Sequence, residues 1–141
     1  MLTLSSSTTL TAILAGAVAA NELAVTVTYI DMKEVAGEIT EFSPRASYTT
    51  ATTGATSKVL LASPAAGIVR QIKEIRIYNR DTAAATVTVR INDSGQVEQY
   101  QATLAAGKSL QYSVDKGFFT DSSASISVTV ADLADIENVT V

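Results

Sequence analysis

The sequence contains no cysteine, no histidine and no tryptophan among its 141 residues. The lack of cysteine excludes disulfide bonds and thiolate-based metal or redox sites. The lack of histidine removes the usual acid–base side chain near neutral pH and excludes a Ser–His–Asp triad. Zinc sites also draw on these two residue types. We therefore expect a protein that is not an enzyme and that binds no cofactor or metal.

One cluster of acids could in principle do chemistry. Asp31, Glu34, Glu38 and Glu41 lie together in "DMKEVAGEITEF", and paired carboxylates hydrolyse glycosidic bonds in many enzymes. The segment lacks the surrounding aromatic side chains that a sugar platform needs. We interpret it as a solvated loop. Phosphate-binding glycine motifs are also absent from the sequence.

Large apolar side chains are scarce, with 3 Phe and 5 Tyr in a sequence that is 47% hydrophobic. Much of that hydrophobic fraction is Ala and Val, which bury little apolar area per residue. The core of a single copy should therefore be thin. Burial of further surface against other copies would add stability, which favours an oligomer.

The net charge of -4 argues against a general nucleic-acid binder, which would be basic. The charge is uneven, however. Residues 58–90 hold six basic side chains against Glu74 and Asp81, whereas residues 91–141 hold seven acids against Lys108 and Lys116. Two interpretations are open: basic and acidic faces meet between subunits, or both are ordinary solvated sheet faces.

An apolar run at residues 10–20 has the small residues of a signal-peptide cleavage site, but no basic residue precedes Lys33. The run is also too short to span a bilayer. We interpret it as part of the fold and expect no membrane partner. Residues 7–23 could form a short helix or a strand followed by a loop.

Apolar and polar residues alternate with a period of two in five segments, which are 22–31, 74–79, 85–93, 109–114 and 125–130. This pattern is typical of half-buried strands. Turn-forming residues at 79–84, 92–95, 104–109 and 115–119 predict hairpin connections. Residues 131–138 could add one helical turn.

These features predict an all-β fold, an antiparallel β-sandwich of jelly-roll or immunoglobulin-like type with an N-terminal extended arm. The sandwich should cover residues 58–141. Residues 1–57 should form the arm and a β extension. Within that part, residues 43–57 are rich in Thr, Ser and Ala and should form a loop, a linker or an extended edge strand.

Arginine and tyrosine side chains are the candidates for an interface with a partner, because both residue types are enriched in protein interfaces. The alternative is that they are outward-facing sheet charges and wet tyrosines at the sandwich ends. The candidate residues are Arg70, Arg76, Tyr78, Arg80, Arg90, Tyr100 and Tyr112.

The run "VLLASPAAGIVRQIKEIRIYNRDTAAATVTVRI", followed by "YQATLAAGKSLQYSVDKGFF", resembles small virion structural proteins of tailed bacteriophages. The matching positions are 62–65, Arg70, 72–73, Ile75, 77–79, Asp81, 86–90, 103–110, Tyr112 and 117–118. These positions are typical of sandwich packing and turns rather than of a catalytic motif. The resemblance implies a structural role in a virion, assembled in the host cytoplasm.

From this resemblance we expect a capsid decoration (cement) protein that binds the major capsid protein and stabilises the shell, with a trimer favoured. The segment 1–57 would then grip the capsid or swap between subunits. One alternative is a neck, tail or fibre-base component that contacts other virion proteins. Another is a module that binds the host surface, against which the 6% aromatic content argues.

Overall fold

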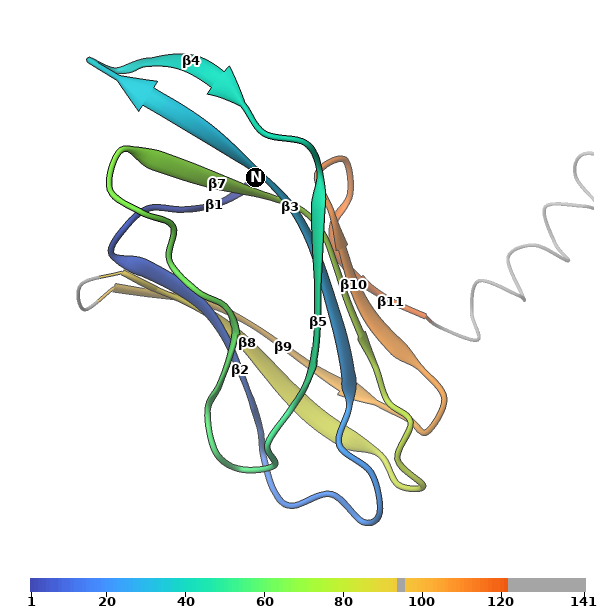
Figure 1. Cartoon of the computed structure of the whole chain (residues 1–141). Coiled ribbons are helices and arrows are strands. Elements are labelled where there is room, and N and C mark those ends of the chain that lie inside the picture. The colour runs from blue at the N-terminus through green and yellow to red at the C-terminus, as the bar shows by residue number, and fades with distance from the viewer. Residues whose placement is uncertain (94–95, 122–141) are drawn as a thin grey trace, which may run out of the picture.

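Two antiparallel β-sheets pack face to face in the computed structural model of the chain (Figure 1), which describes residues 1–93 and 96–121. The predicted all-β antiparallel sandwich is confirmed. The residues that the structure describes contain no helix, and thus none long and apolar enough to cross a membrane. The strand predicted at 125–130 and the helical turn predicted at 131–138 lie outside the described residues.

The larger sheet has seven strands, and its main path runs β11-β10-β7-β3-β4, with β1 paired to β7 and β5 paired to β3. These strands are β1 (Leu2–Leu4), β3 (Ala24–Val35), β4 (Glu38–Phe42), β5 (Ala46–Ala51), β7 (Ile68–Tyr78), β10 (Ser109–Ser113) and β11 (Gly117–Thr120). The smaller sheet has the order β6-β2-β8-β9. Its strands are β6 (Lys58–Leu61), β2 (Thr8–Leu14), β8 (Ala85–Asp93) and β9 (Gln96–Leu104).

The core lies between the inner faces of the two sheets, and alternation along the strands builds it. Val27 of β3 lies opposite Ile75 of β7, and both are buried. Val87 of β8 is fully buried on the facing sheet. Burying a side chain of this size contributes about 1.5–3 kcal/mol. The predicted strands at 22–31, 74–79, 85–93 and 109–114 correspond to β3, β7, β8 and β10.

The N-terminal residues are part of this core rather than an arm beside it. Leu4, Leu10 and Leu23 are completely buried, and β2 lies between β6 and β8 in the smaller sheet. Residues 1–57 supply β1 to β5, so the expected division at residue 57 does not follow the fold. The short alternation of small residues in β2 had left a helix and a strand equally open for this segment. The segment 7–23 forms a strand and a loop, and 43–57 contains the edge strand β5.

Two of the four predicted hairpin connections are instead crossings between the sheets. The hairpins around 92–95 and 115–119 are confirmed, because β8 pairs with β9 and β10 pairs with β11. Residues 79–84 and 104–109 carry the chain from one sheet to the other. Asn79 fixes this corner, since its buried amide donates hydrogen bonds of 2.9 Å to the carbonyls of Ala83 and Leu104.

The segment 31–42 is a β-hairpin and not the expected loop. Strands β3 and β4 pair from Met32↔Phe42 to Val35↔Glu38. The connecting residues Ala36 and Gly37 have φ values of 53° and 81°. Two positive φ angles in a two-residue connection are the requirement of a type I′ turn, which matches the twist of paired strands. Every residue of β4 is exposed, and the hairpin projects from the sandwich (Figure 1).

Candidate interaction pocket

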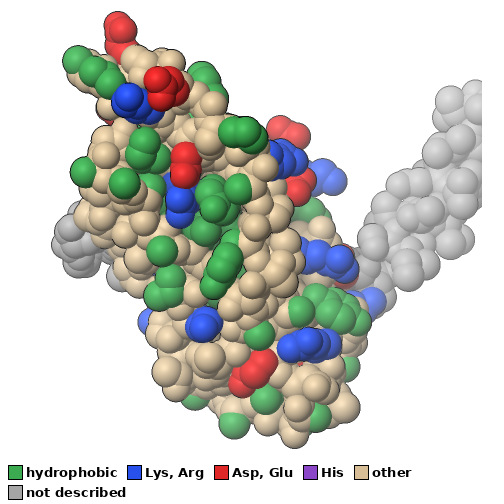
Figure 2. Space-filling model, viewed as in Figure 1, with side chains coloured by type: hydrophobic (Ala, Val, Ile, Leu, Met, Phe, Trp, Pro, Cys, Tyr) green, Lys and Arg blue, Asp and Glu red, His purple; other side chains and the backbone are tan. Residues whose placement is uncertain are grey.

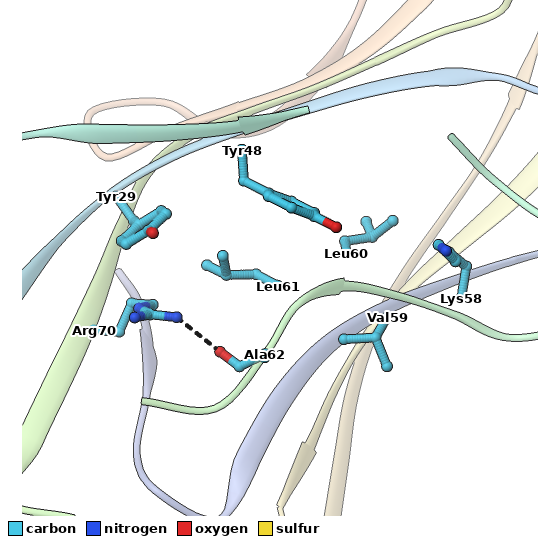
Figure 3. A pocket seen from close by; sticks show the side chains of 8 residues that line it. All are labelled: Tyr29, Tyr48, Lys58, Val59, Leu60, Leu61, Ala62 and Arg70. Atoms are coloured by element: carbon cyan, nitrogen blue, oxygen red, sulfur yellow. Dashed lines mark hydrogen bonds between the residues drawn. The ribbon is translucent and has the colours of Figure 1, made fainter. Parts of the chain in front are cut away.

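The open side of the sandwich, between β5 of one sheet and β6 of the other, contains a pocket of about 400 Å³. Figure 3 shows the lining residues, which are Tyr29, Tyr48, Lys58, Val59, Leu60, Leu61, Ala62 and Arg70. They come from β3, β5, β6 and β7 and from the residue after β6. We call this the β5–β6 pocket. Its wall is mainly apolar and aromatic, and both of its charged residues are basic.

Arg70 forms the inner wall of the pocket and is held from several sides. Its Nε and Nη2 atoms donate hydrogen bonds of 2.7 and 2.9 Å to the two carboxylate oxygens of Asp31. Nη1 donates to the carbonyl of Ala62 at 3.0 Å, and the guanidinium carbon lies 4.4 Å from the ring centroid of Tyr29. The hydrogen bond to Asp31 raises the pKa of Arg70 above its usual value. Arg70 is therefore a fixed part of the wall.

A β-bulge places Arg70 on this inner wall. Along β7, Ile75 and Ile77 face the core, so strict alternation would place Arg70 on the outer face with Glu74. Lys73 has no partner in the register between β7 and β3, and the register shifts at this point. One inserted residue reverses the faces on which the side chains before and after it alternate, so residues 68–72 are out of step with residues 74–78. The bulge therefore brings Arg70 opposite Asp31.

The mouth of the pocket is apolar and half-exposed. The exposed fractions of Tyr48 and Val59 are 45% and 47%, and these residues lie on the edge strands β5 and β6. Lys58 lies at the same mouth and makes no ion pair with any residue that the structure describes. Figure 2 shows hydrophobic side chains along the middle of the molecule on this face. Such a surface is suited to protein contact.

A second hollow of about 170 Å³ adjoins the base of the projecting hairpin. Asp31 lines it, so the Asp31–Arg70 pair forms the partition between the two hollows. Lys33 and Glu41 also line it and form an exposed ion pair of 3.9 Å. Beyond this pair, Phe42 has an exposed fraction of 67%. The open side of the sandwich thus combines the pocket and the hairpin.

The seven candidate interface residues do not share one surface. Arg70 lines the pocket. Arg76 and Tyr78 lie together on β7, where the guanidinium is 5.6 Å from the ring centroid. Arg80 donates a 2.7 Å hydrogen bond to the carbonyl of Glu22 and so holds a loop. Arg90 of β8 pairs with Thr11 across the smaller sheet, away from the others.

The two remaining candidates, Tyr100 and Tyr112, close the other side of the sandwich. The ring of Tyr100 stacks on Phe118 with centroids 4.6 Å apart. Tyr112 is buried and packs against the same ring at 5.1 Å. Its hydroxyl accepts a 2.9 Å hydrogen bond from the backbone N–H of Leu2. Tyr112 therefore has a structural position, with only 4% of its surface exposed.

Asp81 connects the two loops at one end of the sandwich. Its carboxylate accepts hydrogen bonds from the backbone N–H groups of Ala19, Ala20 and Asn21 at 2.7–3.0 Å and from that of Thr82. These bonds, with Ala19 contributing most, lower the pKa of Asp81 to about 2. The buried carboxylate thus remains ionised and holds the β2–β3 loop against the β7–β8 crossing.

The described residues offer surface for contact but no reactive cluster. Within 1–93 and 96–121, no group of three or more Asp and Glu residues could hold a metal ion. Glu34, Glu38 and Glu41 lie along an exposed hairpin, and Asp31 is paired with Arg70. Tyr29, Tyr48 and Val59 were not singled out by the sequence, because they come from three different strands. Their only sequence signal is an aromatic or β-branched residue at an alternating position.

No protein-family model, curated protein or solved structure matches the chain.

Proposed function

We propose that this protein is a non-enzymatic structural component of a tailed-phage virion, placed on the capsid as a decoration protein. The observation that carries the proposal is the open side of the sandwich. There the paired side chains of Arg70 and Asp31 line two adjoining hollows that the exposed apolar residues Tyr48, Val59 and Phe42 also line. Exposed apolar side chains on a rigid frame support binding to another protein. The resemblance of residues 59–119 to phage virion proteins supplies the kind of partner, which is the major capsid protein or another virion protein.

The mechanism is burial of surface between copies and shell. Each copy contributes a modest interface, and the summed contacts of many copies hold neighbouring capsid subunits together. Long strands in the middle of the larger sheet, such as β3 between β7 and β5, give each copy a continuous hydrogen-bonded scaffold for these contacts. Self-association into a trimer would place three such surfaces around a three-fold position of a shell.

The decisive experiment locates the protein in the particle. Virions of the phage that encodes the chain should be purified, and the protein should be identified in them by mass spectrometry. Immunogold labelling should then decorate the capsid surface. Label confined to the neck or tail would replace the decoration role by the neck, tail or fibre-base alternative. Absence of the protein from purified virions would overturn the structural role altogether.

The native mass of the purified protein tests the trimer. Light scattering on a sizing column should give three times the mass of one 14.7 kDa chain. A monomer at all accessible concentrations would contradict the trimer. The protein would then bind the shell as single copies and not as a preformed trimer.

A further inference from the structure

We propose that the β3–β4 hairpin tip of one copy docks in the β5–β6 pocket of the next copy. The tip comprises residues 33–42. This inference deepens the proposed function and rests on its self-association, because it names the contact that joins the copies. Both surfaces belong to the described part of the chain and both lie on the open side of the sandwich.

The tip presents apolar side chains that its own chain leaves uncovered. The exposed fractions are 51% for Val35, 48% for Ile39 and 67% for Phe42. These residues lie on both strands of a two-stranded projection closed by a type I′ turn. A projecting hairpin can enter a hollow that a flat sheet face cannot reach. Exposed apolar residues concentrated on a projection favour a protein partner.

The pocket offers a matching apolar surface. The half-exposed side chain of Tyr48 lies at its mouth, Val59 of the edge strand β6 also lines it, and the buried Leu60 and Leu61 form its floor. Its volume of about 400 Å³ can admit more than one side chain of the tip. Figure 3 shows Tyr48, Leu60 and Leu61 around the same space, with Arg70 at one end beside Tyr29.

Charge supports a second copy as the occupant. The tip contains Glu34, Glu38 and Glu41 against Lys33, so its formal charge is 1 − 3 = −2. Only Glu41 of these acids forms an ion pair with a described residue, at 3.9 Å from Lys33. The charged residues lining the pocket are Lys58 and Arg70. Arg70 is already paired with Asp31, so Lys58 supplies the uncompensated positive charge that an acidic projection of an identical molecule would meet.

Strand edges add a second attraction. Among the described strands, β4 pairs only with β3, and β6 pairs only with β2. Each presents backbone N–H and C=O groups on its other side, and exposed edges of this kind pair with strands of other chains. Docking of the tip brings the free edge of β4 close to the free edge of β6 or β5.

The tip and the pocket are different surfaces, so the contact is head to tail. A heterologous contact leaves one free tip and one free pocket in any open chain of copies. Rotation that closes after three copies gives a trimer and satisfies every surface. The same contact without closure gives a filament.

Charge reversal on each surface tests the contact. The tip variant carries Glu34→Lys and Glu38→Lys, and the pocket variant carries Lys58→Glu. Each should weaken self-association at least about tenfold, as measured by sedimentation equilibrium. A triple variant that carries all three changes should associate more tightly than either parent. Matched controls are Glu74→Lys and Lys116→Glu, which lie elsewhere on the surface, and both should associate like the unchanged protein.

Mixing separates this contact from a symmetric one. The tip variant retains an intact pocket and the pocket variant retains an intact tip, so the mixture should yield a one-to-one dimer and no trimer. Two outcomes overturn the proposal: unchanged association of both variants, or a mixture that remains monomeric. Circular dichroism should confirm that each variant is folded before its self-association is measured.

A chain ending at residue 121 tests the other occupant. The segment 122–141 carries Asp132, Asp135 and Glu137 and no basic residue, so it could also be attracted to the pocket. The shortened chain should still associate through the hairpin tip. Loss of association on shortening would overturn the proposal in favour of the C-terminal segment. Virion localisation is measured separately, so failure here leaves the proposed function standing.

Discussion

Arg70 of β7 binds Asp31 of β3 through both carboxylate oxygens, at 2.7 and 2.9 Å. The exposed fractions of the two side chains are 15% and 28%, so water screens the pair only in part. The guanidinium also donates to the Ala62 carbonyl after β6. One side chain thus connects the two sheets at the open side. The shape of the β5–β6 pocket depends on this connection.

We expect Arg70→Ala and Asp31→Ala each to lower the free energy of unfolding by about 1–3 kcal/mol, because each leaves a partly buried charge without its hydrogen bonds. The double variant should lose less than the sum, with a coupling of about 0.5–3 kcal/mol. Urea unfolding of the four proteins measures this cycle. The exposed Lys33–Glu41 pair, at 3.9 Å, is the control and should couple by less than about 1 kcal/mol. Equal coupling in both pairs would contradict the role of Arg70.

We expect Asp81→Asn to destabilise the protein at pH 7 and to do so less as the pH falls. The folded pKa of Asp81 is lowered to about 2 from its ordinary value of 3.8. A lowered folded pKa stabilises the protein above the unfolded pKa, and this contribution is lost as the pH falls through the window between the two values. Asparagine lacks the charge and replaces one accepting oxygen by a donor.

Urea midpoints at pH 7 and pH 3 measure this dependence for the unchanged protein and the Asp81→Asn variant. The difference between their midpoints should shrink at pH 3. Glu38→Gln is the control, because Glu38 is exposed on β4 and accepts none of the hydrogen bonds described. A difference that stays constant between the two pH values would show that Asp81 acts through shape rather than charge.

We expect Leu10→Ala to cost about 2–5 kcal/mol, since truncation of a fully buried leucine loses transfer free energy and leaves a cavity. Val59→Ala on the neighbouring strand should cost less than about 1 kcal/mol, because Val59 is 47% exposed.

Deletion of residues 1–20 should abolish cooperative unfolding, because it removes β1 and β2. A shortened chain that still unfolds cooperatively would instead show that residues 1–20 are an arm that the sandwich does not need for folding.

The strands with β-branched alternation could be predicted from the sequence. The segment predicted at 85–93 has the same first and last residues as β8. Alternation says which residues are buried but not which strand lies alongside. For that reason, 79–84 and 104–109 were expected to be hairpins although they cross between sheets. For residues 7–23 a short helix and a strand followed by a loop both stayed open, because Ala and Thr in "TTLTAIL" give weak alternation.

The candidate site could be predicted only in part. Arg70 was singled out as a charge for a partner, but the bulge at Lys73 turns it inward to Asp31. A bulge of this kind leaves no reliable mark in a single sequence, because any residue can occupy it. Tyr48 was missed since it stands in a Thr- and Ser-rich segment, where only pairing with β3 reveals that it faces inward with Val27.

We expect Asn79→Asp to be more damaging than its near-identical shape suggests. The Asn79 amide is fully buried and donates to the carbonyls of Ala83 and Leu104, while its oxygen accepts from the N–H of Asp81. A carboxylate has no donor, so both carbonyls lose their partner and face a negative charge. Each unsatisfied buried polar group costs about 1–3 kcal/mol, so the loss should be about 2–4 kcal/mol at pH 7.

Acid should restore part of this stability, because a protonated carboxyl group regains one O–H donor. Thermal unfolding of the Asn79→Asp variant at pH 7 and pH 4 measures the effect, with Ser57→Asp as the control at an exposed loop position. The difference in melting temperature from the unchanged protein should be smaller at pH 4 than at pH 7 for Asn79→Asp but not for the control. If the two variants behave alike, the sheet crossings are held by packing, and the Asn79 amide does not fix the corner. The 79–84 and 104–109 connections would then tolerate substitution of Asn79, whose amide now joins them.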